Sequence, residues 1–183
     1  MVELADFVPH APVPAAIVEE YRGRVPDELV EIWEQYGYGT FGEGFLRIID
    51  PLQYETEIGH CIGKTQGDGI TIPIMTTGLG DLITWEPSLG LVAIQYRLGR
   101  TYGLGTRMRS ALRLIEDGLI LSRLGAEIFP KAVALHGEPA YEESFIFVPL
   151  LSMGGQAKVQ NLHKRKTIAS IQVAADTQGV IGR

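Results

Sequence analysis

The sequence of 183 residues predicts an α+β fold, in which a central, mainly antiparallel sheet is flanked by helices in a single compact domain. Helical patterns come first, three β-rich runs follow, and further helices with one late strand end the chain. The turns between the three β-rich runs are short enough to join antiparallel neighbours. The length suits one well-filled core better than two, so we expect one domain over residues 1–183.

Two helices are predicted near the N-terminus. The first covers Val13–Tyr21 and ends at Gly23; the second begins at Pro26, a residue suited to a first helical position, and ends at Gly37. In the second helix, the i, i+3, i+4, i+7 spacing makes one apolar stripe of Leu29, Ile32, Trp33 and Tyr36. Its acidic residues, which the same spacing places on the opposite side, are Asp27, Glu28, Glu31 and Glu34. The helix should therefore bury one face and expose carboxylates on the other.

The middle of the chain is predicted to be mainly β-structure. A buried strand is expected over Phe45–Ile49, and a short helix opened by a proline is expected over Pro51–Ile62. Three strands separated by glycine-containing turns should follow, over Ile70–Thr77, Leu82–Glu86 and Leu89–Tyr96.

The C-terminal part is predicted to be mainly helical. Met108, Leu112, Ile115 and Leu119 recur at helical spacing after Thr106, which indicates a helix there. Composition then favours a helix over Ala126–Leu135, a strand over Phe145–Leu150 and a closing helix over Val159–Thr177.

Charge is distributed unevenly along the chain. The first sixty residues contain twelve acidic and three basic side chains, whereas the remaining 123 contain ten acidic and thirteen basic ones. The N-terminal part should therefore attract cations or a basic partner. The alternative interpretation is that the acidic surface only keeps the protein in solution.

The compartment is predicted from what the sequence lacks. No cationic start followed by an apolar run is present, and the longest apolar runs, such as Phe145–Met153, are too short for a membrane helix. Cys61 is the single cysteine, so no internal disulfide can form. We expect a cytoplasmic protein that does not bind membranes.

The sequence contains a match to a dinucleotide-binding motif, but not between the elements that such a motif requires. Gly37, Gly39 and Gly42 satisfy G-x-G-x-x-G, yet they follow a helix and lead into a strand, whereas the dinucleotide fingerprint follows a strand and opens a helix. These glycines are interpreted as residues that allow a turn from helix to strand. We therefore expect no cofactor.

The residues that could carry catalysis are not arranged for it. The four histidines, His10, His60, His136 and His163, lack the spacing of a zinc site. His60 and Cys61 are neighbours whose side chains should diverge, and Cys61 is interpreted as a small buried residue. Asp81 with Glu86 could form an acid pair, but a turn aspartate bonded to its own backbone is the commoner arrangement. We expect no metal site and no enzyme.

One dense basic cluster occurs, from His163 to Lys166. It is interpreted as one turn of the closing helix with a solvated face, because no other basic patch of that density accompanies it in an acidic chain. Direct nucleic-acid binding is therefore not expected.

Four sequence blocks resemble those of the GAD-like domain family with its C-terminal extension. They are Val25–Gly39, Gly44–Pro51, Gly78–Trp85 and Phe147–Gly155, and the resemblance extends over roughly residues 9–171. It divides the chain into a GAD-like core over 9–105 and a helical C-terminal extension over 106–183 packed on it. The most distinctive residues of the blocks are interpreted as structural: Trp33, Gly37, Asp50, Pro51, Gly80, Asp81, Trp85, Gly154 and Gly155.

The resemblance implies a function. Members of this family are known as bacterial immunity proteins paired with DNase effectors of type VI secretion, so the resemblance implies a cytoplasmic protein that binds and blocks a cognate DNase toxin. It implies protection of the producing cell and its siblings, and no catalytic residues. The alternative is a non-catalytic regulatory or scaffolding module unrelated to toxins; a small hydrolase using His60, Cys61 or Asp81 is the remaining possibility.

The contact surface is predicted from charge rather than from the family. A nuclease binds a polyanion, so its active-site groove should be basic, and clustered carboxylates can compete for it. The predicted toxin-binding residues are Asp27, Glu28, Glu31, Glu34, Glu43, Glu55 and Glu57. A solvated helix face, or contact through the loops around Leu98–Gly105, is the alternative.

Overall fold

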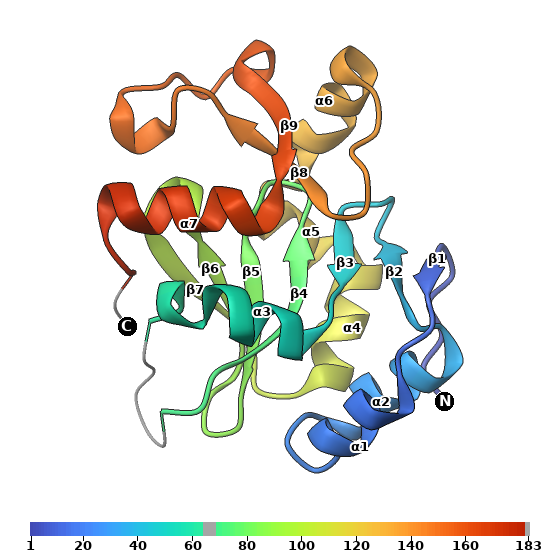
Figure 1. The fold of residues 1–183 in the computed structure, drawn as a ribbon. Helices are drawn as coiled ribbons and strands as arrows, with labels where there is room; N and C mark the ends of the chain where they lie inside the picture. Colours follow the sequence, from blue (N-terminus) through green and yellow to red (C-terminus); the bar gives the residue numbers. More distant parts are fainter. Residues whose placement is uncertain (64–68, 182–183) are drawn as a thin grey trace.

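The fold is an antiparallel sheet with helices on both faces, as seen in a computed structural model that describes residues 1–63 and 69–181. Within these residues seven strands form one sheet in sequential order, and every neighbouring pair is antiparallel (Figure 1). The strands are β1 (Val8–Ala11), β2 (Tyr38–Phe41), β3 (Leu46–Ile48), β4 (Ile72–Thr77), β5 (Leu82–Glu86), β6 (Gly90–Gln95) and β7 (Arg100–Gly105). The predicted α+β class with a mainly antiparallel sheet is confirmed.

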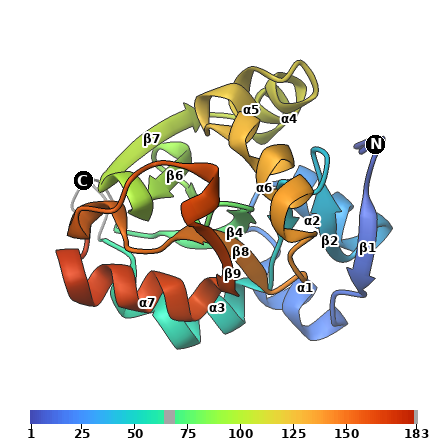
Figure 2. The same cartoon turned by 90° about the horizontal axis from the view of Figure 1, so that it is seen from above.

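The helices cover the sheet in two layers (Figure 2). One layer is made by α3 (Pro51–Ile58) and α7 (Thr167–Gln178), which pack on a core around Leu82 and Ile94. On the other face a larger core includes Ile83 and Ala93, the alternate residues of the same strands. Its helices are α1 (Ala15–Tyr21), α2 (Asp27–Gln35), α4 (Met108–Glu116), α5 (Leu119–Arg123) and α6 (Phe129–His136).

Strands β1 and β2 were not predicted. Pro9 in β1 is tolerated because β1 is an edge strand, where a missing backbone donor faces no partner. Gly39, one of the three glycines of the G-x-G-x-x-G match, lies inside β2. A Cβ there would lie 2.3 Å from the Val8 carbonyl oxygen, so glycine is required by the close approach of β1. Strand β7 was also missed, since its glycines hide the strand pattern.

The helix predicted after Thr106 is confirmed over Met108–Glu116, but its continuation through Leu119 is wrong, because the chain turns at Gly118 with a φ of 73° and starts α5 at Leu119. Its stripe residues Met108, Leu112 and Ile115 are buried as expected, whereas Leu119 is 56% exposed. Glycine reaches this left-handed conformation without the Cβ penalty, so helical periodicity alone could not reveal the break.

The predicted closing helix over Val159–Thr177 is also wrong in its first half. Strand β9 (Leu162–Lys166) pairs with β8 (Glu143–Phe147) in a separate antiparallel hairpin, and α7 begins only at Thr167. Pairing with β8 decided the conformation of this segment, which local composition left ambiguous. The region 106–183 is therefore not purely helical, while its predicted boundary with 9–105 stays a prediction.

A capping residue fixes the start of α3. Asp50 caps α3 by accepting from the backbone N–H of Leu52 and Gln53, at 2.9 Å and 3.3 Å, which is why Asp50–Pro51 starts that helix. Among the described residues, none of the helices has the length and apolar character required to cross a membrane.

Candidate functional site

Helix α2 has the amphipathic arrangement that its sequence predicts. Leu29, Ile32 and Trp33 are buried, and Tyr36 at the end of the stripe is partly buried. Asp27 and Glu34 are exposed, while Glu28 and Glu31 are partly exposed. The predicted carboxylate face therefore exists on the surface of the molecule.

Nearby cations partly neutralise that face. Glu28 forms an ion pair with Arg109 of α4 at 3.3 Å, and Glu34 forms one with Arg22 at 2.8 Å. Glu31 lies 3.5 Å from the N-terminal ammonium group of Met1. Exposed pairs of this kind add little stability, but each reduces the net negative charge that a partner would meet.

The other three predicted contact residues lie in different places. Glu55 of α3 accepts a hydrogen bond from the Tyr21 hydroxyl and lies 4.0 Å from Arg24, so it is joined to α1. Glu57, also on α3, accepts from the Gln53 side chain at 2.8 Å and lines a groove between α3 and α7. Glu43 stands apart from both, at the turn of the β2–β3 hairpin with a φ of 56°.

Glu43 borders a cleft of about 880 Å³, called here the hairpin cleft. The cleft lies between the β2–β3 hairpin, β1 and the chain from α5 to Tyr141. Its described lining residues are Asp6, Val8, Pro9, His10, Thr40, Gly42, Glu43, Gly44, Phe45, Arg47, Gly118, Leu121, Ser122, Ala126, Glu127, Phe129, Pro130, Val133, Glu138, Pro139 and Tyr141. Apolar walls, a polar rim and a buried cation are thus combined in one concave surface, as is typical of binding sites.

The cation of the hairpin cleft is Arg47 on β3. It is 2% exposed, and its guanidinium carbon lies 5.9 Å from the centre of the Phe129 ring. Burial lowers the pKa of Arg47 to about 10, against its ordinary value of 12.5. Its one described hydrogen bond runs from Nη1 to the Phe45 carbonyl oxygen at 3.4 Å, and Nε meets no acceptor among the described residues.

Arg47 was not among the functional residues predicted from the sequence. Its signal was nevertheless present, since Arg47 interrupts the apolar run Phe45–Ile49 that predicted a buried strand. A charged residue at the centre of such a strand must either find a partner or remain desolvated at a cost, so it was the residue of that strand to question.

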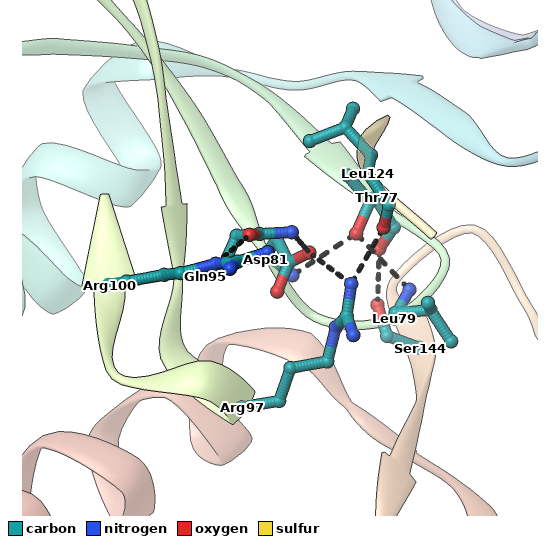
Figure 3. Close-up of polar contacts among 8 residues, drawn as sticks. All are labelled: Thr77, Leu79, Asp81, Gln95, Arg97, Arg100, Leu124 and Ser144. Atoms are coloured by element: carbon teal, nitrogen blue, oxygen red, sulfur yellow. Dashed lines mark hydrogen bonds and ion pairs between the residues drawn. The ribbon is translucent and has the colours of Figure 1, made fainter. Parts of the chain in front are cut away.

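A second buried polar cluster surrounds Asp81, which is fully buried (Figure 3). Its Oδ2 accepts from Arg97 at 3.3 Å and from the Gln95 side chain at 3.4 Å. Burial raises the pKa of Asp81 to about 6, although Arg97 and Gln95 oppose that rise. The interpretation of Asp81 as a turn aspartate bonded to its own backbone is therefore wrong.

The Asp81 cluster joins distant parts of the chain. Arg97 also donates to the carbonyl oxygen of Leu124, at the end of α5, at 2.6 Å. Ser144 of β8 donates to the Thr77 carbonyl oxygen at 3.1 Å and lies 2.7 Å from the Thr167 hydroxyl. These bonds tie the C-terminal elements to the sheet, which indicates a structural role.

The residues of the hydrolase alternative are not brought together. Cys61 is 1% exposed, as predicted, and burial raises the pKa of its thiol, which disfavours the nucleophilic thiolate. His60 is exposed beside it. Across residues 1–63 and 69–181, no group of three His, Cys, Asp or Glu side chains is placed to hold a metal ion.

The basic cluster from His163 to Lys166 lies on strand β9 instead of a helix. Its Lys166 pairs with Glu142 at 2.7 Å, so part of its charge is balanced locally.

Comparisons with known proteins agree with the predicted resemblance. Residues 114–172 match the family model described as T6SS immunity protein Tdi1, C-terminal, where T6SS denotes the type VI secretion system. No curated protein matches the chain. The crystal structure of Atu4351 from Agrobacterium tumefaciens has a similar fold, with a TM-score of 0.72, 18% sequence identity and coverage of 92% of this chain and 85% of that one.

The match to the GAD-like domain model spans half of the chain and contains three of the four sequence blocks that carried the resemblance, while the fourth lies within residues 114–172. By this match over residues 3–96, the chain belongs to the GAD-like domain family.

Proposed function

We propose that this protein is an immunity protein that binds and neutralises a cognate DNase toxin delivered by type VI secretion. It acts in the cytoplasm of the producing cell and its siblings, by stoichiometric binding without catalysis of its own. The observation that supports this most directly is the match of residues 114–172 to the C-terminal region of the T6SS immunity protein Tdi1.

The charge distribution supports a nuclease as the partner. A DNase must hold a polyanion and is expected to have a basic groove, to which a carboxylate-rich surface is complementary. The proposed contact residues are Asp27, Glu28, Glu31, Glu34, Glu43, Glu55 and Glu57, which the fold distributes over α2, α3 and the β2–β3 hairpin. Glu34 also borders a groove of about 660 Å³ between β1, α1 and α2, which gives the α2 face a concave neighbour.

Co-expression with the nuclease encoded beside the gene tests the proposed function. We expect copurification as a stable complex and protection of plasmid DNA in a degradation assay, with protection complete at one immunity protein per toxin. Turnover of a substrate by the purified protein alone, or failure to bind any nuclease encoded beside it, contradicts the proposal.

The contribution of α2 is tested by reversing Glu28, Glu31 and Glu34 to Lys together. Loss of electrostatic steering should weaken binding by about tenfold or more and reduce its dependence on salt. The matched control reverses Glu116, Asp117 and Asp176 to Lys, because these exposed acids line none of the grooves described above. Equal affinities for the two triple variants would remove α2 from the contact surface.

A further inference from the structure

The hairpin cleft contains a buried hydrogen-bond donor without a sufficient acceptor. Arg47 has Nε unsatisfied among the described residues and a single weak bond from Nη1. A buried guanidinium normally pairs with a carboxylate or with several carbonyl oxygens, because an uncompensated charge is costly to bury. In the free protein the Arg47 guanidinium therefore lacks hydrogen-bond acceptors, which a group bound in the cleft would supply.

The sheet register directs Arg47 toward the cleft. Val8 pairs with Thr40, and Thr40 pairs with Arg47, so these three residues form one cross-strand row on the same face of the sheet. All three line the cleft. Arg47 thus projects from the strands that form its floor, with the rings of Phe45 and Phe129 beside it as apolar walls.

The rim of the hairpin cleft is acidic. Its exposed carboxylates are Asp6, Glu43, Glu127 and Glu138. In the described part of the chain none of the four forms an ion pair. Asp6 accepts from the Glu43 backbone N–H, and Glu127 accepts from the Ser122 hydroxyl, which leaves their negative charges in place. In α2, by contrast, Glu28, Glu31 and Glu34 each form a direct ion pair, whereas Glu127 has only a longer-range electrostatic interaction with Lys131.

Both family-matched regions build the cleft. Glu43, Phe45 and Arg47 belong to the part that matches the GAD-like domain, whereas Leu121, Phe129 and Glu138 belong to the part that matches the Tdi1 C-terminal region. The Phe45 and Phe129 rings meet across this boundary, with centroids 5.5 Å apart in a T-shaped arrangement. The C-terminal region therefore supplies the second wall of the concave surface.

We propose that the hairpin cleft is the docking site for a loop of the toxin in which Lys or Arg residues flank an apolar or aromatic residue. The apolar residue packs against the partly exposed apolar lining of the cleft, which includes Leu121 and Val133. The flanking cations meet the rim acids, and a backbone carbonyl oxygen of the loop accepts from Arg47. A neutral carbonyl suits this position better than a carboxylate, because the rim acids would repel a second negative charge. The proposal rests on the proposed function and specifies where the toxin binds.

Arg47→Met tests the donor role with two readouts. Without toxin, the melting temperature should rise, on the order of 5 °C, because an uncompensated buried charge is replaced by an apolar side chain. Affinity for a catalytically inactive form of the nuclease should fall by about tenfold to a hundredfold, as expected when one charge-assisted hydrogen bond is lost. Arg107→Met, at an exposed arginine outside the cleft, should change neither quantity.

Reversing the charge of the rim acids tests whether the cleft and the toxin loop are complementary in charge. Glu43, Glu127 and Glu138 are changed to Lys together, and the control is again the triple reversal of Glu116, Asp117 and Asp176, which alters the net charge equally. The rim variant should bind at least tenfold more weakly than the control. A photo-crosslinking residue at position 122 should attach to a toxin loop that contains Lys or Arg.

The outcomes separate this proposal from the proposed function. If the unaltered protein binds no nuclease, the proposed function fails and the docking site fails with it. If the unaltered protein binds, but the Arg47 and rim variants bind as tightly as their controls, the toxin docks elsewhere and the proposed function survives. Loss of affinity in a rim variant that still melts at the temperature of the unaltered protein supports the cleft, since misfolding is then excluded.

Discussion

Arg97 and Arg47 are both largely buried, but they differ in the charged partners and hydrogen-bond acceptors that the fold places around them. Arg97, 16% exposed, lies 3.3 Å from the Asp81 carboxylate and donates to the Leu124 carbonyl oxygen. Arg47, 2% exposed, has one weak bond to a backbone oxygen and no ion pair in the described part of the chain. The Nε of each arginine meets no acceptor among the described residues, but Arg97 has a carboxylate partner and a short hydrogen bond through Nη2, whereas Arg47 has neither and lies at the floor of an open cleft.

The difference separates a structural charge from one available to a partner. The Arg97 bonds connect the turn after β4 with the end of α5, so they hold the C-terminal elements against the sheet. The Arg47 guanidinium makes no comparable connection. Because an uncompensated buried cation destabilises the free protein, its presence in the cleft is consistent with the docking proposal above.

The largest effect is expected for Arg97→Met. Removing this partner leaves the fully buried Asp81 carboxylate uncompensated, so the free energy of unfolding at pH 7 should fall by about 3–5 kcal/mol. Chemical denaturation measures it, with Arg100→Met as the control, because Arg100 is exposed and contributes one bond to Gln95 at 2.9 Å. A similar loss of stability in Arg97→Met and Arg100→Met would show that the Arg97–Asp81 ion pair contributes no more than the Arg100–Gln95 hydrogen bond.

The pH dependence of the free energy of unfolding should reveal the titration of Asp81. Its pKa is about 6 in the folded protein against an ordinary value of 3.8, so the folded state binds the proton more tightly than the unfolded state. The contribution of Asp81 to the free energy of unfolding is therefore greatest below pH 4 and falls by about 3 kcal/mol as the pH rises to 6 and above. The difference between the unaltered protein and Asp81→Asn, followed by denaturation from pH 4 to 7, should trace this fall; a flat difference contradicts it.

Arg47→Met should change stability in the opposite direction to Arg97→Met. Replacing the unpaired cation with an apolar side chain of similar length should raise the free energy of unfolding by about 2 kcal/mol. The same denaturation experiment measures both variants side by side. A destabilised Arg47→Met protein would mean that the guanidinium is satisfied in the free molecule, and the contrast between the two arginines would disappear.

The smallest effect is expected for Ser144→Ala. The Ser144 hydroxyl is fully buried and bonds both the Thr77 carbonyl oxygen and the Thr167 hydroxyl, so its loss should cost about 1–2 kcal/mol. Ser170→Ala serves as the control, since the Ser170 bond to the Lys166 carbonyl oxygen is exposed and its loss should cost less than about 0.5 kcal/mol. Equal losses of unfolding free energy in Ser144→Ala and Ser170→Ala would mean that Ser144 is not part of the buried cluster around Asp81.

Local patterns predicted the elements with strong periodicity or clear punctuation. Helix α2 and strand β5 were predicted within a residue or two, and Asp50–Pro51 correctly marked the start of α3. The errors fall where tertiary pairing overrode local preference. Strand β9 forms because β8 lies beside it, and β1 forms because β2 offers an edge that tolerates Pro9.

The candidate site was predicted only in part, since charge counts along a sequence say nothing of ion pairing. Glu43 was predicted as a contact residue, but the second wall of its cleft comes from segments about eighty residues or more away, such as Phe129 and Glu138. Arg109, which neutralises Glu28, is equally distant in sequence. Distances of this kind are set by the packing of α4 to α6 against the hairpin.

The sequence by itself determined the α+β class, the amphipathic face of α2 and the family resemblance, because periodicity, turn residues and ordered blocks are local properties of the chain. Only the tertiary structure decided which charges remain unpaired, which of the two arginines has a carboxylate partner and where a concave surface forms. Those properties depend on side chains far apart in sequence meeting at a few ångströms, where desolvation and pairing energies are decided.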